Sequence, residues 1–123
     1  MDKGKHTYRL EAVSHSPFIA QMNLYLCIAS FDDPQQKATA VRYRDAKPAL
    51  VDQTVVVETE FPALFITVGV YVVPQEYPRS DVVADSPDFP LEYRVLRDGE
   101  VIGTETLQVN RWGGVQVINI RYE

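Results

Sequence analysis

The sequence LEYRVLRDGEVIGTETLQV, residues 91–109, decides the fold class. Apolar and charged side chains alternate before the central Asp98-Gly99 pair, and a second run rich in β-branched residues follows it. Alternation with a period of two is typical of a strand that buries one face. Asp-Gly between two such runs favours a tight β-hairpin, because glycine accepts a positive φ. The stretch therefore predicts two antiparallel strands that are joined at residues 98 and 99.

The same pattern predicts further strands along the rest of the chain. They cover about residues 7–13, 18–30, 38–44, 53–61, 63–73 and 115–122. In the strand at 38–44, the alternation places Thr39, Val41 and Tyr43 on the inward face. The run at 63–73 is apolar on both faces, which indicates the centre of a sheet. Gly69 inside that run suggests a β-bulge or a close contact.

Composition agrees with an all-β domain. Val, Ile and Thr number 30 and the aromatic residues 13, whereas Leu, Ala and Met number only 19. A chain of 123 residues has the size of one domain. We predict a two-sheet antiparallel β-sandwich of seven to eight strands, of the immunoglobulin-like or Greek-key type, over residues 7–123. A closed eight-stranded β-barrel is the alternative, and residues 1–6 are predicted to form a flexible tether.

Charge argues against nucleic acid as a partner. The net charge is -5, and the nearest approach to a basic cluster is the pair Arg42 and Arg44, which Asp45 follows at once. Binding to nucleic acid needs a dense basic footprint, so we interpret this pair as a solvated strand face. No apolar run reaches the roughly 18–20 residues of a transmembrane helix.

Signals for an enzyme are weak, and we predict no catalytic residue and no cofactor. Cys27 lies in an apolar run, where a free cysteine is expected to be buried and unreactive. The triplet Ser14-His15-Ser16 sets hydroxyls beside an imidazole, but neighbours on an extended chain point to opposite sides. The spacing of the histidines and the cysteine does not match a zinc site, and no phosphate-binding glycine loop is present.

The segment between Pro74 and Pro90 is the main candidate for a binding loop. Its four prolines and its acidic residues interrupt the strand pattern for 17 residues, and loops of that length are often functional. Tyr77, Arg79 and Phe89 would supply aromatic and cationic contacts, which are common at binding surfaces.

Two further groups of residues are weaker candidates. Arg111 and Trp112 lie in a glycine turn, where the indole either presents a platform to a partner or caps the open end of the sandwich. Asp81, Asp85 and Asp88 could supply oxygen ligands to Ca²⁺, although their spacing matches no known calcium loop.

These features predict a non-enzymatic binding or spacer module of a bacterial cell-envelope or secreted protein, with a protein or a glycan as partner. No signal peptide is present in the chain, but the polar residues 1–6 are typical of the spacer in a processed lipoprotein and equally of a plain disordered start. The alternative function is a carbohydrate-binding module that uses Trp112 with Tyr77 or Tyr25. A small hydrolase is the third possibility.

Overall fold

The chain folds as two layers of antiparallel strands. The computed structural model describes residues 5–32, 40–47, 49–75, 88–110 and 115–123. Over these residues the strands are β1 (Tyr8–Val13), β2 (Met22–Phe31), β3 (Ala40–Ala46), β4 (Val55–Glu58), β5 (Phe65–Pro74), β6 (Phe89–Arg97), β7 (Glu100–Val109) and β8 (Val115–Tyr122). The prediction of an all-β chain is confirmed.

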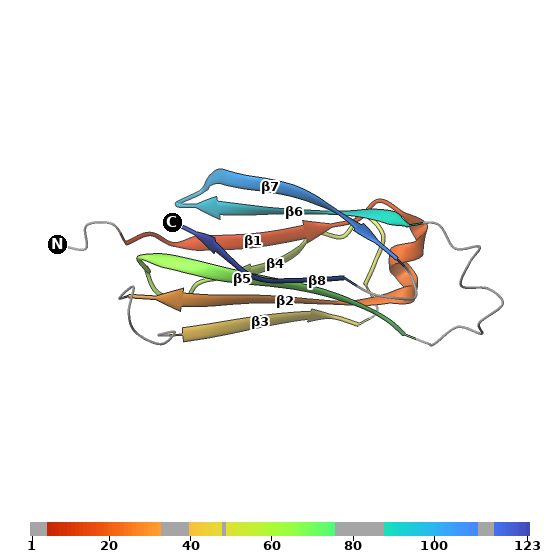
Figure 1. Cartoon of the computed structure of the whole chain (residues 1–123), viewed down its shortest axis with the longest axis horizontal. Coiled ribbons are helices and arrows are strands. Elements are labelled where there is room, and N and C mark those ends of the chain that lie inside the picture. Colours follow the sequence, from red (N-terminus) through yellow and green to blue (C-terminus); the bar gives the residue numbers. More distant parts are fainter. Residues whose placement is uncertain (1–4, 33–39, 48, 76–87, 111–114) are drawn as a thin grey trace.

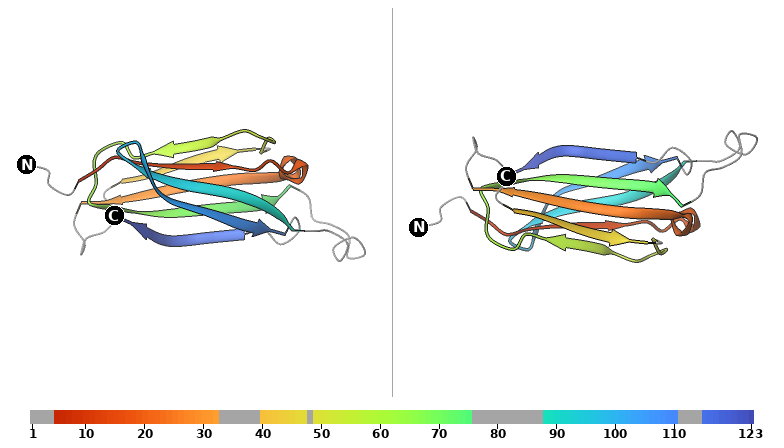
Figure 2. Two further views of the ribbon diagram at one scale, coloured as in Figure 1. Left: turned by 90° about the horizontal axis from the view of Figure 1, so that it is seen from above. Right: turned by 90° about the horizontal axis from the view of Figure 1, so that it is seen from below.

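The strands form two four-stranded sheets, which lie face to face in Figure 1. One has the order β4-β1-β6-β7 and is called the β1 sheet; the other has the order β3-β2-β5-β8 and is called the β2 sheet. Figure 2 shows the two layers from above and below, with their strands crossing at an angle. The sheets do not close on each other, so the molecule is a β-sandwich and the alternative of a closed barrel is wrong.

The core lies between the two inner faces. On β2, the buried apolar side chains are those of Met22, Leu24, Leu26 and Ile28, with the residues between them more exposed. Alternation of this kind is the direct result of the pleat, which turns successive side chains to opposite faces. The contribution of β2 to the core therefore consists of the apolar side chains that the period-two alternation places on one side of this strand.

The β6–β7 hairpin is confirmed. Arg97 pairs with Glu100, and the two residues between them have positive φ values, 51° at Asp98 and 87° at Gly99. Two successive positive φ values are the signature of the type I′ turn, whose twist matches that of the strands it joins.

The predicted position of the strand at 63–73 is also confirmed. β5 lies inside the β2 sheet and pairs with β2 on one side and β8 on the other. The register against β8 shifts between Val68 and Val70, so Gly69 stands at an irregularity of the ladder, as the sequence suggests.

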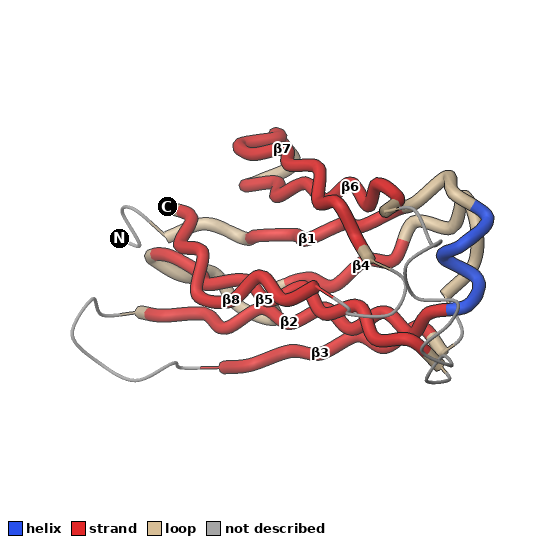
Figure 3. Tube along the Cα trace, turned by 45° about the vertical axis from the view of Figure 1, so that its right-hand side comes forward, coloured by secondary structure: helices blue, strands red, loops and turns tan. Residues whose placement is uncertain are grey.

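The beginning of the second strand differs from the prediction. Residues Pro17–Gln21 form a short 3-10 helix before β2, drawn in blue in Figure 3. The Ser16 hydroxyl accepts a hydrogen bond from the backbone N–H of Phe18 at 3.3 Å, and Pro17 stands at the first turn. A serine cap followed by proline favours a helical turn over an extended strand.

The inward face predicted for the third strand is wrong. Tyr43 is opposite Cys27 in the β2–β3 ladder and Val41 is opposite Ala29, on the outer face of the sheet, and the Tyr43 side chain is 72% exposed. Thr39 lies outside the described residues. Because β3 is an edge strand, both of its faces are accessible and its hydrophobic pattern does not fix its register.

The opposite face of β3 carries the two arginines. Arg42 and Arg44 border β4, and Arg42 forms an ion pair with Glu60 at 3.5 Å. Both arginines are exposed, which agrees with the interpretation of this pair as a solvated strand face.

Both ends of β1 are held by histidine–aspartate pairs. His6 Nδ1 lies 2.5 Å from Asp98 Oδ2, and Asp98 Oδ1 also accepts hydrogen bonds from the backbone N–H and the hydroxyl of Thr7. At the other end, His15 Nδ1 lies 2.6 Å from Asp52 Oδ1. Asp98 and Asp52 each have a positive φ, a conformation that aspartate tolerates better than most residues.

We expect these pairs to give the stability a defined pH dependence. The hydrogen bond that the His15 ring donates to Asp52 raises the pKa of His15 above its ordinary 6.5, so the contribution of His15 to stability is complete below pH 6.5 and is lost as the pH rises through the raised pKa. The hydrogen bonds from His6 and then Thr7 lower the pKa of Asp98 below 3.8, so its contribution is present above pH 3.8 and is lost as the pH falls through the lowered pKa.

Thermal unfolding across the pH range measures this effect. The difference in Tm between the wild type and His15→Gln should be largest below pH 6.5 and should shrink above it. The difference for Asp98→Asn should be largest above pH 3.8 and should shrink in acid. A difference that stays constant at all pH values, in either variant, would contradict a role for the charged pair.

Candidate binding face

Most of the binding residues predicted from the sequence lie outside the described part of the chain. This holds for Tyr77, Arg79, Arg111 and Trp112. Phe89 is described and is 2% exposed, because it begins β6 and packs against Phe18 with 6.1 Å between the ring centroids. Its ring therefore belongs to the core.

The predicted calcium ligands are only partly described. Asp81 and Asp85 lie outside the described residues. Asp88 is exposed, and its Oδ1 accepts a hydrogen bond from the Asn110 side chain at 3.2 Å. Among the residues that the structure describes, no group of three or more His, Cys, Asp and Glu side chains is placed to hold a metal ion.

The hydroxyls beside His15 have structural partners. Ser14 is buried, and its hydroxyl donates to the backbone carbonyl of Pro90 at 2.7 Å. The Ser16 hydroxyl caps the short helix, while the His15 ring is turned to Asp52. This arrangement gives each side chain a role in holding the chain between β1 and β2.

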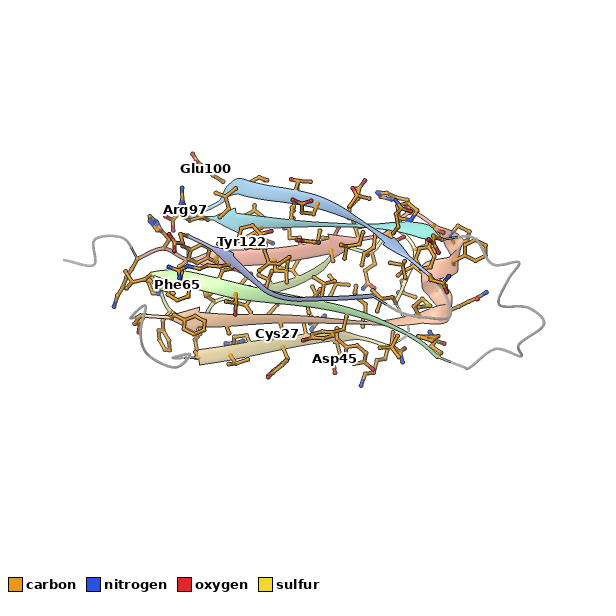
Figure 4. All side chains as sticks on the ribbon, in the orientation of Figure 1. Cys27, Asp45, Phe65, Arg97, Glu100 and Tyr122 are labelled. Atoms are coloured by element: carbon orange, nitrogen blue, oxygen red, sulfur yellow. The ribbon has the colours of Figure 1, made fainter. Side chains whose placement is uncertain are left out.

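Cys27 is half-buried, so the expectation of a buried thiol is wrong in degree. It lies on the outer face of β2, between residues whose side chains enter the core. Partial burial raises the pKa of the Cys27 thiol, which lowers the fraction of the reactive thiolate at neutral pH. Figure 4 labels Cys27 on the lower sheet, with Asp45 of β3 near it and Phe65 toward the end of the sandwich where Arg97 and Glu100 are also labelled.

Three tyrosines surround Cys27 on the outer face of the β2 sheet. Tyr25 precedes it by two residues on β2, and Tyr71 is the cross-strand partner of Tyr25 on β5. Tyr43 on β3 is the cross-strand partner of Cys27 itself. Residues that oppose each other in an antiparallel ladder share a face, so we call Tyr25, Tyr43 and Tyr71 with Cys27 the tyrosine face.

The ring of Tyr71 packs against Gly69. A Cβ atom built on Gly69 would stand 2.9 Å from Tyr71 Cε2 and 3.3 Å from its hydroxyl oxygen, so one edge of the ring fills the space that a side chain at position 69 would need. Gly69 is the partner of Cys27 on the β5 side, as Tyr43 is on the β3 side. Cys27 therefore lies between Tyr43 on one neighbouring strand and the glycine next to the Tyr71 ring on the other.

The charged groups at the face are paired among themselves. Lys47 Nζ lies 3.6 Å from Asp45 Oδ2 and 4.9 Å from the centroid of the Tyr25 ring. Its ammonium thus occupies one face of that ring in a cation–π contact. Of the three tyrosines, Tyr43 is the most exposed, and Tyr25 is the one with a cation over its ring.

An aromatic cluster closes one end of the same sheet face. The Phe31 and Phe65 rings stack with 4.6 Å between centroids and an interplanar angle of 3°, and the Arg121 guanidinium lies 3.8 Å from the Phe65 centroid. Arg121 is also ion-paired with Glu123. Phe65 is buried under these neighbours, so this cluster stabilises the sheet end more than it presents a free surface.

The outer face of the β1 sheet is a charge network. Glu11 is 6% exposed; its Oε1 accepts a hydrogen bond from Arg94 Nε, and its Oε2 forms an ion pair with Arg9 Nε at 3.1 Å. An open depression of about 280 Å³ lies beside it, lined in part by Glu92 and Thr104. The buried carboxylate of Glu11 is paired with two guanidinium groups, which is the arrangement expected of a structural ion cluster.

Sequence reasoning found only part of the tyrosine face. The sequence indicates Tyr25 only as a companion of Trp112 in the alternative of a carbohydrate-binding module, and it predicts the wrong face for Tyr43. No functional role for Tyr71 follows from the sequence. To place the three tyrosines on one face, the register among β2, β3 and β5 must be known, and the sequence alone does not give this register.

The described residues contain no helix that is long and apolar enough to span a membrane. A scan against protein-family models, a search among curated proteins and a search among solved structures gave no match to this chain.

Proposed function

We propose that the chain is a non-enzymatic β-sandwich module that binds a partner through the tyrosine face. The observation that carries the proposal is the placement of Tyr25, Tyr43 and Tyr71 on three adjacent strands of one sheet, around the half-buried Cys27. Tyrosine is enriched at binding surfaces because its ring gives a large contact area at a small cost in conformational entropy.

The position of these rings supports recognition over a purely structural role. Tyr43 is on an edge strand and 72% exposed, where its ring contributes little to the core. An exposed aromatic ring contributes free energy only when a partner covers it and removes its apolar surface from water. A rigid sheet also holds the three rings at fixed separations, which lowers the entropy lost on binding.

Within the part of the chain that the structure describes, the two histidines and the hydroxyls beside His15 have structural partners. Both histidines are paired with aspartates at the ends of β1, and the hydroxyls of Ser14 and Ser16 serve the backbone. These contacts support the non-enzymatic part of the proposal.

A selection experiment that does not assume the class of ligand tests this function. The wild type would be screened against a phage-displayed random peptide library and against a glycan array. We expect ligands in at least one format, and we expect them to be lost in the Tyr43→Ser/Tyr71→Ser double variant. Truncation of aromatic contact residues at an interface commonly costs more than 1 kcal/mol each.

A matched double variant controls for the loss of exposed apolar area. Phe61→Ser/Val101→Ser removes two exposed apolar side chains that are not part of the tyrosine face, and it should bind as the wild type does. If no ligand in either format depends on Tyr43 and Tyr71, the binding function is wrong and a spacer role would be the better description.

A further inference from the structure

We infer that the outer face of the β2 sheet is the contact surface of a two-fold dimer, in which the tyrosine faces of two copies of this chain pack against each other. This inference rests on the proposed function and names the partner as a second copy. Three properties of the face carry it: the lack of charge on its central strands, the exposure of its apolar side chains and its area.

The two central strands of the β2 sheet carry no charged residue on either side. β2 has the sequence MNLYLCIASF and β5 the sequence FITVGVYVVP. A strand that is apolar on both faces, as β5 is, is typical of a sheet that is covered on both sides. The core covers one side of these strands, so the same signal predicts a partner for the other side.

The corresponding positions of the β1 sheet are charged. Its central strands, β1 and β6, turn Arg9, Glu11, Glu92 and Arg94 outward. Burial of charged side chains in a contact costs free energy, so such a face is suited to water. The two outer faces of the sandwich therefore differ, and the outer face of the β2 sheet is the one suited to a partner surface without charge.

Three apolar side chains are exposed on the outer face of the β2 sheet. Tyr43 is 72% exposed, and Val41 and Val73 are each 42% exposed. The ladders of β2 with β3 and β5 place all three on the same side of the sheet. A contact that covers them gains free energy in proportion to the apolar area that it removes from water.

The charged groups at the rim of this face are paired. Lys47 Nζ lies 3.6 Å from Asp45 Oδ2, and Arg121 is paired with Glu123. These pairs limit the local repulsion between two copies, although each chain has a net charge of -5. A second copy matches the face because it presents the same uncharged centre and the same neutral pairs at its rim.

The area of the face fits a dimer. The sheet has four strands of seven to ten residues, which at about 4.8 Å between strands and about 3.4 Å per residue give roughly 600 Å². Two such faces bury about 1,200 Å², the lower end of the range for stable protein interfaces. We therefore expect a Kd on the order of micromolar.

The geometry of the contact closes the assembly at two copies. Two identical faces form an isologous contact, which leaves no further copy of that face free. Cys27 is the sixth of ten residues in β2 and has β3 and β5 on either side, so it lies near the middle of the face. When the two faces overlap, the two Cys27 side chains come within reach of a short bifunctional reagent.

Two measurements on the full chain test the inference. Sedimentation equilibrium from about 1 µM to about 1 mM protein gives the Kd, and bismaleimidoethane links cysteines that lie close together. Cys27 is the only cysteine of the chain, so a linked dimer must join two Cys27 residues. We expect a monomer–dimer equilibrium and a linked product whose yield rises with the population of the dimer.

Lysine substitutions at exposed positions separate this face from the rest of the surface. Tyr43→Lys and Val73→Lys should each raise the Kd by about tenfold or more, because two-fold pairing buries the new charge twice. Val101→Lys is the matched control on β7 of the other sheet, where the valine is 50% exposed, and its Kd should stay within about twofold of the wild type. Urea unfolding of each variant shows whether the domain is intact.

The salt dependence gives an independent measurement. Because the centre of the contact is uncharged, raising NaCl to about 0.5 M should not weaken the dimer. A contact through the charged outer face of the β1 sheet would weaken instead, since salt screens exposed ion pairs.

The outcomes distinguish this inference from the function on which it rests. If the chain is monomeric up to about 1 mM while peptide or glycan ligands depend on Tyr43 and Tyr71, the inference fails and the binding function stands. If it is monomeric and no ligand depends on these tyrosines, both fail. A dimer that is unchanged in Tyr43→Lys and Val73→Lys, or that dissociates as salt is added, lies on another surface and overturns the inference. So does a dimer without a Cys27 link, provided that dilute protein reacts with N-ethylmaleimide.

Discussion

Replacing Leu10 with alanine should lower the free energy of unfolding by about 2–5 kcal/mol. Leu10 is completely buried and stands at the middle of the β1 sheet, where Val57 of β4 and Val95 of β6 are its cross-strand partners. Truncation removes apolar contacts and leaves a cavity that neighbouring strands, fixed by their hydrogen bonds, do not fill. Since small domains are stable by only about 5–15 kcal/mol, this loss is a large part of the total.

Urea unfolding followed by fluorescence or circular dichroism measures the effect. The matched control is Val101→Ala on the edge strand β7, where the side chain is half-exposed. That variant should stay within about 0.5 kcal/mol of the wild type. A loss below about 1 kcal/mol for Leu10→Ala would mean that the packing between the sheets near β1 is not as the structure has it.

The second large effect is expected at the hairpin turn. Gly99→Val should destabilise the domain by about 1–3 kcal/mol, because a β-branched residue resists the φ of 87° that this position adopts. No described atom lies within 4 Å of a Cβ built on Gly99. The cost therefore comes from the backbone and not from a clash.

Gly99→Asn is the control for this interpretation. Asparagine tolerates a positive φ much better than valine, so its effect on the free energy of unfolding should be clearly smaller. Equal losses in the two variants, or no loss in Gly99→Val, would contradict the type I′ turn. The turn also carries Asp98, which binds Thr7 and His6, so a change in its conformation also reaches the chain before β1.

The candidate site could be predicted less well than the fold. The alternation of Tyr25 and Cys27 with Leu24 and Leu26 places the first two residues on the outer face of their strand, and the structure agrees. The same reasoning fails for Tyr43, since an edge strand with alternating apolar and charged residues is compatible with either face turned inward. Contacts between strands far apart in the sequence decide that choice.

The sequence by itself determined which segments form strands and whether a strand such as β5 is apolar on one face or on both. Period-two alternation, the Asp98-Gly99 turn and the doubly apolar run of β5 are local signals, and each follows from the pleat or from the φ that glycine permits. They suffice to predict an all-β sandwich and the core positions of strands such as β2, because each such strand must bury its apolar face.

Only the tertiary structure decided which surfaces come together. The ladder between β2 and β3 turned Tyr43 outward, the pairing of β2 with β5 set Tyr71 beside Tyr25, and the absence of a side chain at Gly69 left room for the Tyr71 ring. His6 and Asp98 are 92 residues apart in the sequence, and His15 and Asp52 are 37 residues apart, so only the folded chain brings each pair together. Pairings at such separations depend on register and on the whole sandwich, and local propensity carries no information about them.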